Sequence, residues 1–294
     1  MKVVITGSSG LIGTALVESL RGDGHDVVRL VRRDPAAPDE ARWDPAAGVV
    51  DDAALTGADA VVNLAGAGIG DKRWTPAYKA EVRNSRIDAT TTIATAVARH
   101  GVGVLVSGSA VGWYGDRGDD VLTESEPSGT GFLADLVRDW EAATEPAAQA
   151  GARVVRIRTG IVLSPDGGAL AQMLPIFKAG LGGRLGSGRQ WFPWISLADE
   201  IAAIRFVLDT GSVSGSLNLS APQPVTNREL TAALGRALHR PAVAFVPRVA
   251  LRIGLGEFAD EGLLVSQRAV PAALLDAGFA FGDQTLDAAL GRML

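Results

Sequence analysis

Five short runs of apolar, largely β-branched residues recur through the first half of the chain. They cover residues 3–6, 27–31, 60–64, 102–107 and 154–157. Most are separated by stretches whose apolar positions recur with the period of a helix. Strands that alternate with helices form parallel sheets, and right-handed crossovers place helices on both faces. The pattern predicts an α/β fold with a doubly wound parallel sheet of the Rossmann type and ligands at the carboxyl ends of its strands.

The pattern changes after about Gly160. Stretches rich in glycine and proline lie at 164–168 and 180–188, and the helical segments are separated by longer loops. We expect a nucleotide-binding core over residues 1–160 and a smaller lobe over residues 161–294 that covers the substrate. The sequence also allows helices or strands after residue 160 to belong to the sheet of the core.

Two polar patterns predict helix starts in this second region. Thr226 and Glu229 have the spacing of a capping box, in which each side chain accepts a hydrogen bond from a backbone amide of the other residue. Ser196, three residues before Asp199, has a similar arrangement. We therefore expect these residues to have structural roles, and we do not assign Asp199 to catalysis.

A glycine loop directly follows the first predicted strand. It consists of Gly7, Ser8, Ser9, Gly10, Leu11, Ile12 and Gly13, and a helical pattern begins within it. A loop of this kind lets the backbone approach a pyrophosphate and directs helix amides toward it. The spacing differs from the simpler G-x-G-x-x-G pattern, but the strand-turn-helix context favours dinucleotide binding over a purely structural turn.

The second predicted strand ends in Arg32 and Arg33. Domains that prefer NAD have an acidic residue in this region, which accepts hydrogen bonds from the adenosine ribose. Two guanidinium groups would instead bind a 2′-phosphate through charge-assisted hydrogen bonds. The sequence therefore predicts NADP(H) as the cofactor, with a solvated surface pair as the alternative for these arginines.

Composition narrows the functional class further. The chain has 294 residues, of which 47% are hydrophobic, and a net charge of -5, so a broad basic surface for nucleic acid or anionic membranes is not expected. It has no cysteine, and its three histidines lack a metal-ligand spacing, so we expect no metal site. The start of the chain does not resemble a signal peptide. We expect a cytoplasmic protein that acts on a small molecule; the sequence allows a homodimer without predicting one.

Several motifs resemble those of the extended short-chain dehydrogenases/reductases, and more narrowly an atypical branch of the epimerase family. The wider resemblance is carried by three segments: Thr6–Gly13, Asn63–Gly66 and Ser107–Gly115. The narrower one is carried by Ser85–Ile87, Phe132–Ala134, Trp140–Glu141, Gln190–Ile195 and Ser266–Arg268. The likeness covers essentially the whole chain, including a C-terminal module from about 246 to 294 that has no assigned function in that family.

This resemblance implies further cofactor contacts. Leu64, Ala65 and Gly66 would line the adenosine side, and Ser107 and Ser109 would lie near the nicotinamide ribose and the reacting carbon. The carboxamide would lie near Thr159, Gly160, Ile161 and Val162. Small residues and hydroxyls after a parallel strand also suit a crevice where a planar cofactor approaches the backbone closely.

The chain lacks the tyrosine and lysine, four residues apart, that the superfamily commonly uses for proton transfer. Its only tyrosines are Tyr78 and Tyr114, and neither has a lysine at that spacing. Ser109 and Tyr114 are therefore our candidates for handling the proton. A positioned proton donor typically contributes 10²–10⁴-fold to a rate, so a reductase with another donor remains open. A non-catalytic sensor or scaffold that responds to NADP(H) is the alternative.

Aromatic residues mark the expected substrate side. Trp191, Phe192 and Trp194 would wall an apolar pocket or pack between the lobes. Trp74 would close the same cleft or form part of an exposed helix entry, and Arg86 stands nearest the position of the family's helix asparagine. Nucleotide-sugar epimerases commonly have an arginine where Phe192 stands, which argues against a UDP-sugar. We expect an oxidoreductase or epimerase acting on a small carbonyl, alcohol or sugar-like compound.

Overall fold

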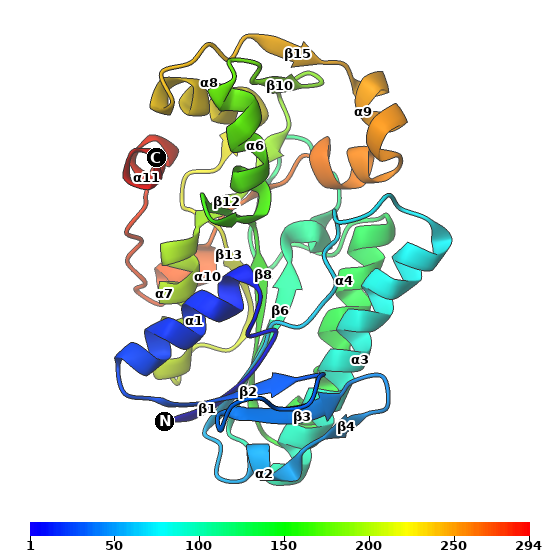
Figure 1. Ribbon diagram of the computed structural model, residues 1–294, viewed down its shortest axis with the longest axis vertical. Coiled ribbons are helices and arrows are strands. Elements are labelled where there is room, and N and C mark those ends of the chain that lie inside the picture. Colours follow the sequence, from blue (N-terminus) through cyan, green and yellow to red (C-terminus); the bar gives the residue numbers. More distant parts are fainter.

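An eight-stranded sheet forms the centre of the protein, and the computed structural model describes all 294 residues (Figure 1). In spatial order its strands are β13 (Gly215–Leu219), β8 (Arg153–Thr159), β6 (Val104–Ala110), β5 (Ala60–Asn63), β1 (Lys2–Thr6), β2 (Asp26–Val31), β3 (Glu40–Asp44) and β4 (Val49–Val50). All neighbours are parallel except β3 and β4. The predicted doubly wound sheet is confirmed. The chain order reverses between β1 and β5, and such a switch point opens a crevice at the strands' carboxyl ends.

The five predicted strands all exist, with shifted ends. The run predicted at 102–107 forms β6 over Val104–Ala110, and the run at 154–157 extends to β8 over Arg153–Thr159. The sequence analysis did not identify β3 or β13 as strands. In β3 the residues Glu40 and Arg42 interrupt the apolar run: Glu40 is buried in an ion pair with Arg33, and Arg42 is exposed.

Helices cover both faces of the sheet (Figure 1). On one face, α1 (Leu11–Gly22) and α7 (Leu197–Asp209) bury Leu16, Leu20 and Ile204 against the strands. On the other lie α2 (Asp52–Leu55), α3 (Pro76–His100), α4 (Phe132–Ala142) and α5 (Glu145–Gln149). Burial of these apolar faces supplies most of the favourable free energy of the layers.

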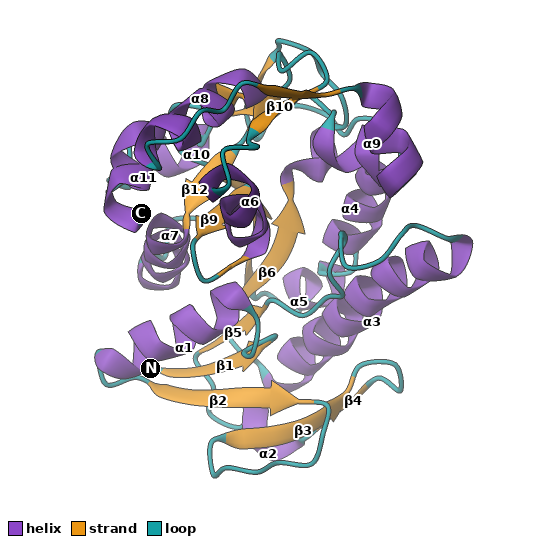
Figure 2. Cartoon of the chain, turned by 45° about the horizontal axis from the view of Figure 1, so that its top comes forward, coloured by secondary structure: helices purple, strands orange, loops and turns teal.

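A second group of elements stands over the carboxyl ends of the strands (Figure 2). Its helices are η1 (Val111–Tyr114), α6 (Gly168–Lys178), α8 (Asn227–Ala237), α9 (Arg248–Leu255), η2 (Ala259–Leu263), α10 (Ala272–Asp276) and α11 (Leu286–Met293). Its strands form the pairs β9 (Ile161–Ser164) with β12 (Trp194–Ser196), β10 (Gly183–Leu185) with β15 (Ala244–Val246), β11 (Trp191–Phe192) with β14 (Val225–Thr226), and β7 (Val121–Leu122) with β16 (Arg268–Ala269). Trp194, Leu230 and Leu290 are buried in its core.

Both predicted helix starts are present. Thr226 and Glu229 form a capping box at the start of α8, and the Ser196 side chain accepts a hydrogen bond from the Asp199 amide at the start of α7. Because α7 and β13 belong to the main sheet and its core, the chain returns to that core well after residue 160. None of the helices combines the length and apolar character that a membrane crossing requires.

Candidate functional site

The glycine loop joins β1 to α1 at the switch point of the sheet. Gly7 has φ +67°, and a Cβ there would lie 2.6 Å from the carbonyl oxygen of Leu64. A Cβ at Gly13 would overlap the carbonyl oxygen of Gly7. The amides of Leu64 and Ala65 donate to Thr6 Oγ1 at 3.1 and 3.2 Å, which fixes the loop after β5 against the glycine loop. Glycine is therefore required at positions 7 and 13 by close backbone contacts.

The loop presents the start of α1 to the crevice. Gly10 is the N-cap residue and provides no side-chain cap, and the first turn contains no acidic residue. The first amides of a helix lack partners within the helix and carry a partial positive charge. These features suit a bound anion such as a pyrophosphate.

A cavity of about 340 Å³ lies at this helix start. Its walls come from the glycine loop, the ends of β5, β6 and β8, and the following segments: Gly7, Gly10, Leu11, Ile12, Gly13, Leu64, Gly108, Ser109, Trp140, Thr159, Ile161, Val162, Gly168 and Ala169. The fold thus brings together most of the predicted cofactor-binding residues, which are far apart in the sequence. The surroundings fit a dinucleotide, because the tightly packed glycine loop leaves the uncapped start of α1 facing the cavity.

Several predicted cofactor residues do not line this cavity. Ser9 is exposed and Ser8 is buried, while Ala65 and Gly66 lie in the adjoining loop. Ser107 is fully buried, and its hydroxyl donates only to the carbonyl of Gly108 at 3.4 Å. A Cβ at Gly160 would overlap the carbonyl oxygen of Pro193, so packing requires this glycine.

Arg32 and Arg33 have different surroundings. Arg33 forms two hydrogen bonds with Glu40, of 2.7 and 2.6 Å, and this contact lowers the pKa of Glu40 to about 2. Arg32 is exposed and has no ion pair. Arg32 is therefore free to bind a phosphate, whereas Arg33 is already engaged by an acid from β3.

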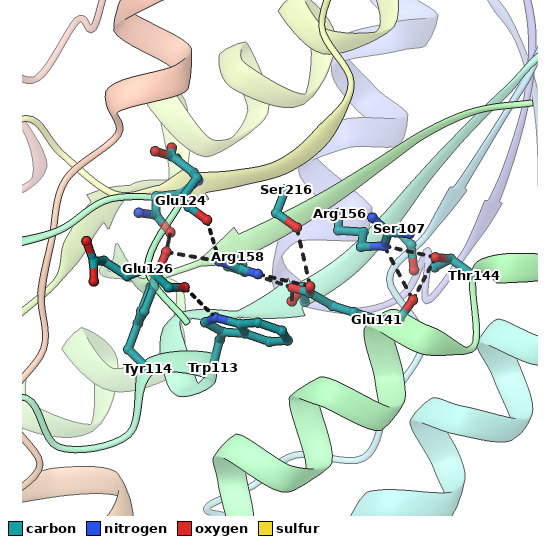
Figure 3. A network of polar contacts seen from close by, with 12 residues as sticks. Ser107, Trp113, Tyr114, Glu124, Glu126, Glu141, Thr144, Arg156, Arg158 and Ser216 are labelled. Carbon is teal, nitrogen blue, oxygen red and sulfur yellow. Dashed lines mark hydrogen bonds and ion pairs between the residues drawn. The ribbon is translucent and has the colours of Figure 1, made fainter. Parts of the chain in front are cut away.

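Ser109 connects the cavity to a buried ion pair. Its hydroxyl donates to Glu141 Oε1 at 2.6 Å, and Arg158 Nε donates to the same oxygen at 2.8 Å. Arg158 Nη2 reaches Glu141 Oε2 at 3.1 Å, and both side chains are less than a tenth exposed. Figure 3 shows Arg158 between Glu141 and Tyr114, above the ring of Trp113. The bidentate contact fixes the carboxylate next to the Ser109 hydroxyl.

Tyr114 lies farther along this network and does not line the cavity. It is fully buried, and its hydroxyl donates to Asn218 Oδ1 at 2.7 Å and lies 3.0 Å from the carbonyl of Thr123. Arg158 Nη1 donates to the same hydroxyl at 3.2 Å. Burial raises the pKa of Tyr114. Of the two candidates for handling the proton, the fold places Ser109 at the cavity and uses Tyr114 to support Arg158.

Glu200, which the sequence analysis did not select, lies behind the cavity wall. It comes from α7, is fully buried, and its Oε1 accepts a hydrogen bond of 2.8 Å from the hydroxyl of Thr159. Its Oε2 has no partner. Burial raises the pKa of Glu200 to about 8. The only signal in the sequence is an acidic residue within the apolar face of a helix.

The predicted substrate residues occupy three different environments. Trp194 is fully buried in the upper core, where its indole donates to the carbonyl of Gln223, so it packs inside the lobe. Trp191 is half-buried, with its indole donating to Asp119. Trp74 packs edge-on against Phe132, with their ring centres 5.1 Å apart. None of these tryptophans lines the cavity at the glycine loop.

The other two candidates, Phe192 and Arg86, belong to β11 and α3. Phe192 is half-buried and packs against the core of the upper lobe. Arg86 lies 5.1 Å from the ring centre of Trp140, which does line the cavity. Arg86 thus contacts a residue of the cavity wall through its guanidinium, without lining the cavity itself.

The sheet, the glycine cradle and the cavity at the switch point define a dinucleotide-binding protein of the short-chain dehydrogenase/reductase type. The model of the NAD dependent epimerase/dehydratase family matches residues 3–220, and the chain belongs to this family. Residues 246–293 match a domain of unknown function, DUF1731. The resemblance inferred from the sequence motifs is confirmed.

Similar proteins span nearly the whole chain. An epimerase family protein of Mycobacterium tuberculosis is 54% identical over 289 residues, which cover 98% of this chain and 96% of that protein. The crystal structure of human epimerase family protein SDR39U1 with NADPH has a TM-score of 0.91 and 34% identity, and covers 100% of this chain and 99% of the human chain. A nucleoside-diphosphate sugar epimerase from Corynebacterium glutamicum has a TM-score of 0.83 and 37% identity, and the match covers 100% of this chain and 58% of that one.

Proposed function

We propose that this chain is an NADP(H)-dependent oxidoreductase that acts by reversible hydride transfer on a small carbonyl, alcohol or sugar-like substrate. Three observations support the cofactor: the glycine cradle, the unpaired Arg32, and the NADPH in the crystal structure of the similar human protein. The observation that carries the proposed reaction is Ser109 in the cavity wall, with its hydroxyl hydrogen-bonded to a fixed carboxylate.

The bound cofactor would supply or accept the hydride, and the residues of the chain would move the accompanying proton. In alcohol oxidation, Ser109 Oγ accepts the proton of the substrate hydroxyl and passes its own to Glu141 Oε1, 2.6 Å away. In carbonyl reduction the same two transfers run in reverse. Arg158 holds Glu141 in place and balances its charge. This pair would perform the proton step without the usual tyrosine and lysine.

The test is to incubate the protein with NADPH and a panel of small aldehydes, ketones and reducing sugars, and to follow the absorbance of reduced nicotinamide. We expect oxidation of NADPH with at least one compound. Ser109→Ala should lower kcat by about 10²–10⁴-fold, the usual contribution of a positioned proton donor. Ser212→Ala, an exposed serine in the loop before β13, is the matched control and should keep the wild-type rate.

If Tyr114→Phe lowered kcat and Ser109→Ala did not, the proton transfer would instead be assigned to Tyr114. The rival function is a non-catalytic sensor or scaffold, which the absence of the tyrosine-lysine pair favours. Tight NADPH binding without turnover across the whole panel would support that rival and contradict an oxidoreductase.

A further inference from the structure

Arg86 has a half-buried guanidinium that forms no salt bridge. It projects from the middle of α3. Its Nη1 donates to the carbonyls of Ala67 at 2.8 Å and Val82 at 3.0 Å. Burial lowers the pKa of Arg86 to about 10, so the group stays charged at neutral pH. Asp71 is near enough to favour the charged form, but no carboxylate contacts the guanidinium. A charge removed from water without a contacting opposite charge is costly, and a bound anion would offset that cost.

The free donors of Arg86 are accessible. Nε and Nη2 form no hydrogen bond within the protein, and neither is among its fully buried unsatisfied atoms. The guanidinium lies against Gly66, where a Cβ would come within 3.2 Å of Arg86 Cζ and 3.4 Å of Nε. Gly66 itself is exposed. Two nitrogen donors of a fixed cation, Nε and Nη2, are therefore open to a ligand beside the loop that follows β5.

Arg86 lies near one end of the cavity, the end that contains Ser109. Its Cζ lies 5.1 Å from the ring centre of Trp140. Trp140 packs over Gly108, where a Cβ would lie 3.0 Å from Trp140 Cζ2, and Trp140, Gly108 and Ser109 line the cavity together. Arg86 is thus associated with the Ser109 end, away from the sheet edge at β3 where Arg32 and Arg33 lie. The other guanidinium at this end, Arg158, is already paired with Glu141.

We propose that Arg86 binds the nicotinamide half of NADP(H). Its ligands there are the second phosphate of the diphosphate, which is the one farther from adenosine, and the ribose that carries the nicotinamide. The glycine loop and α1 offer amides to the diphosphate, and Arg86 adds a charged donor from beside Trp140 and Gly66. This assignment differs from the substrate contact that the sequence suggested for Arg86. It rests on the proposed cofactor but not on turnover.

Calorimetric titration with three ligands tests this assignment. NADPH and 2′-phospho-ADP-ribose both contain the second phosphate and ribose, whereas 2′,5′-ADP contains only the adenosine half. In Arg86→Met, we expect the first two to bind about 10- to 100-fold more weakly, as for the loss of a charge-assisted hydrogen bond, and 2′,5′-ADP to bind as in wild type. Arg86→Lys keeps the charge and should give an intermediate loss.

Arg153→Met is the matched control. Arg153 is also a half-buried arginine that donates only to carbonyls, those of Val207, Leu208 and Val213, but it lies away from the cavity. The Arg153→Met variant should bind all three ligands with wild-type affinity. Thermal unfolding of each variant checks that it is folded. Unchanged NADPH affinity in Arg86→Met, or an equal loss for all three ligands, would overturn the assignment. Failure of the wild-type protein to bind NADPH would overturn the proposed cofactor, and the assignment with it.

Discussion

Glu200 is a carboxylic acid that the fold keeps uncharged behind the cavity. Burial raises its pKa to about 8, and the single hydrogen bond from Thr159 offsets only part of that rise. In the unfolded chain the same group ionises near its ordinary value of 4.5. Between these two values the folded state binds one proton more than the unfolded state, so the free energy of unfolding falls as pH rises.

This difference predicts the pH dependence of one variant. Glu200→Gln removes the titration and keeps an acceptor for Thr159. Relative to this variant, wild type should lose about 1.4 kcal/mol of stability per pH unit between roughly pH 4.5 and 8, and no more above that range. Urea unfolding at several pH values measures the effect. Glu18→Gln, at an exposed residue without an ion pair, is the control, and parallel curves for wild type and Glu200→Gln would contradict the prediction.

At the scale of elements, two helix starts shape the site. The start of α1 is left open by glycines, as an anion-binding end requires. The start of α4 is instead closed by Glu261 from η2, whose two carboxylate oxygens accept the amides of Phe132 at 3.0 Å and Leu133 at 2.9 Å. The negative charge stabilises this helix end. Of these two helix starts, α1 therefore keeps its amides free for a ligand.

Two glycines of α1 provide a direct test of this cradle. Gly13→Ala places a Cβ against the Gly7 carbonyl, so the loop must shift and NADPH affinity should fall by at least about tenfold, the equivalent of one lost hydrogen bond. Gly22→Ala in the same helix meets no atom within 4 Å and should bind NADPH normally. Calorimetry gives both affinities. Wild-type binding by Gly13→Ala would show that the loop is not the cofactor cradle.

At the scale of the whole molecule, residues 246–293 belong to both cores. Leu274, Phe279 and Phe281 are buried with the residues of the main sheet, and Leu286 and Leu290 are buried in the upper lobe. Polar contacts also join this segment to the rest of the chain. Strand β16 pairs with β7, and Glu261 accepts a hydrogen bond from the amide of Phe132 at the start of α4. The matched domain of unknown function is therefore an integral part of the packing.

Removing this segment should abolish cooperative folding. Each large buried side chain contributes roughly 2–5 kcal/mol, so losing five of them costs about 10–25 kcal/mol, as much as or more than the usual total stability of about 5–15 kcal/mol. A chain ending at residue 245 should show no cooperative thermal transition by circular dichroism. Ile253→Ala, at an exposed position of α9, should unfold like wild type. A cooperative transition in the shortened chain would show that the segment is dispensable for folding.

The sequence by itself determined the features that depend on neighbouring residues. The apolar runs identified five strands of the sheet, and the strand-glycine-helix pattern located the cradle, since the crowding of Gly13 against Gly7 is a local property. The caps at Ser196 and Thr226 were predictable for the same reason. The crowding of Gly7 against Leu64 is instead a tertiary contact.

Only the tertiary structure decided which polar groups meet. Ser109 and Glu141 are 32 residues apart, and Thr159 and Glu200 are 41 apart, so no local spacing relates them. Arg33 has the same side chain as Arg32, yet only Arg33 is paired with an acid of β3. The function of a charged side chain depends on its partner and its burial, and both are set by where distant parts of the chain pack.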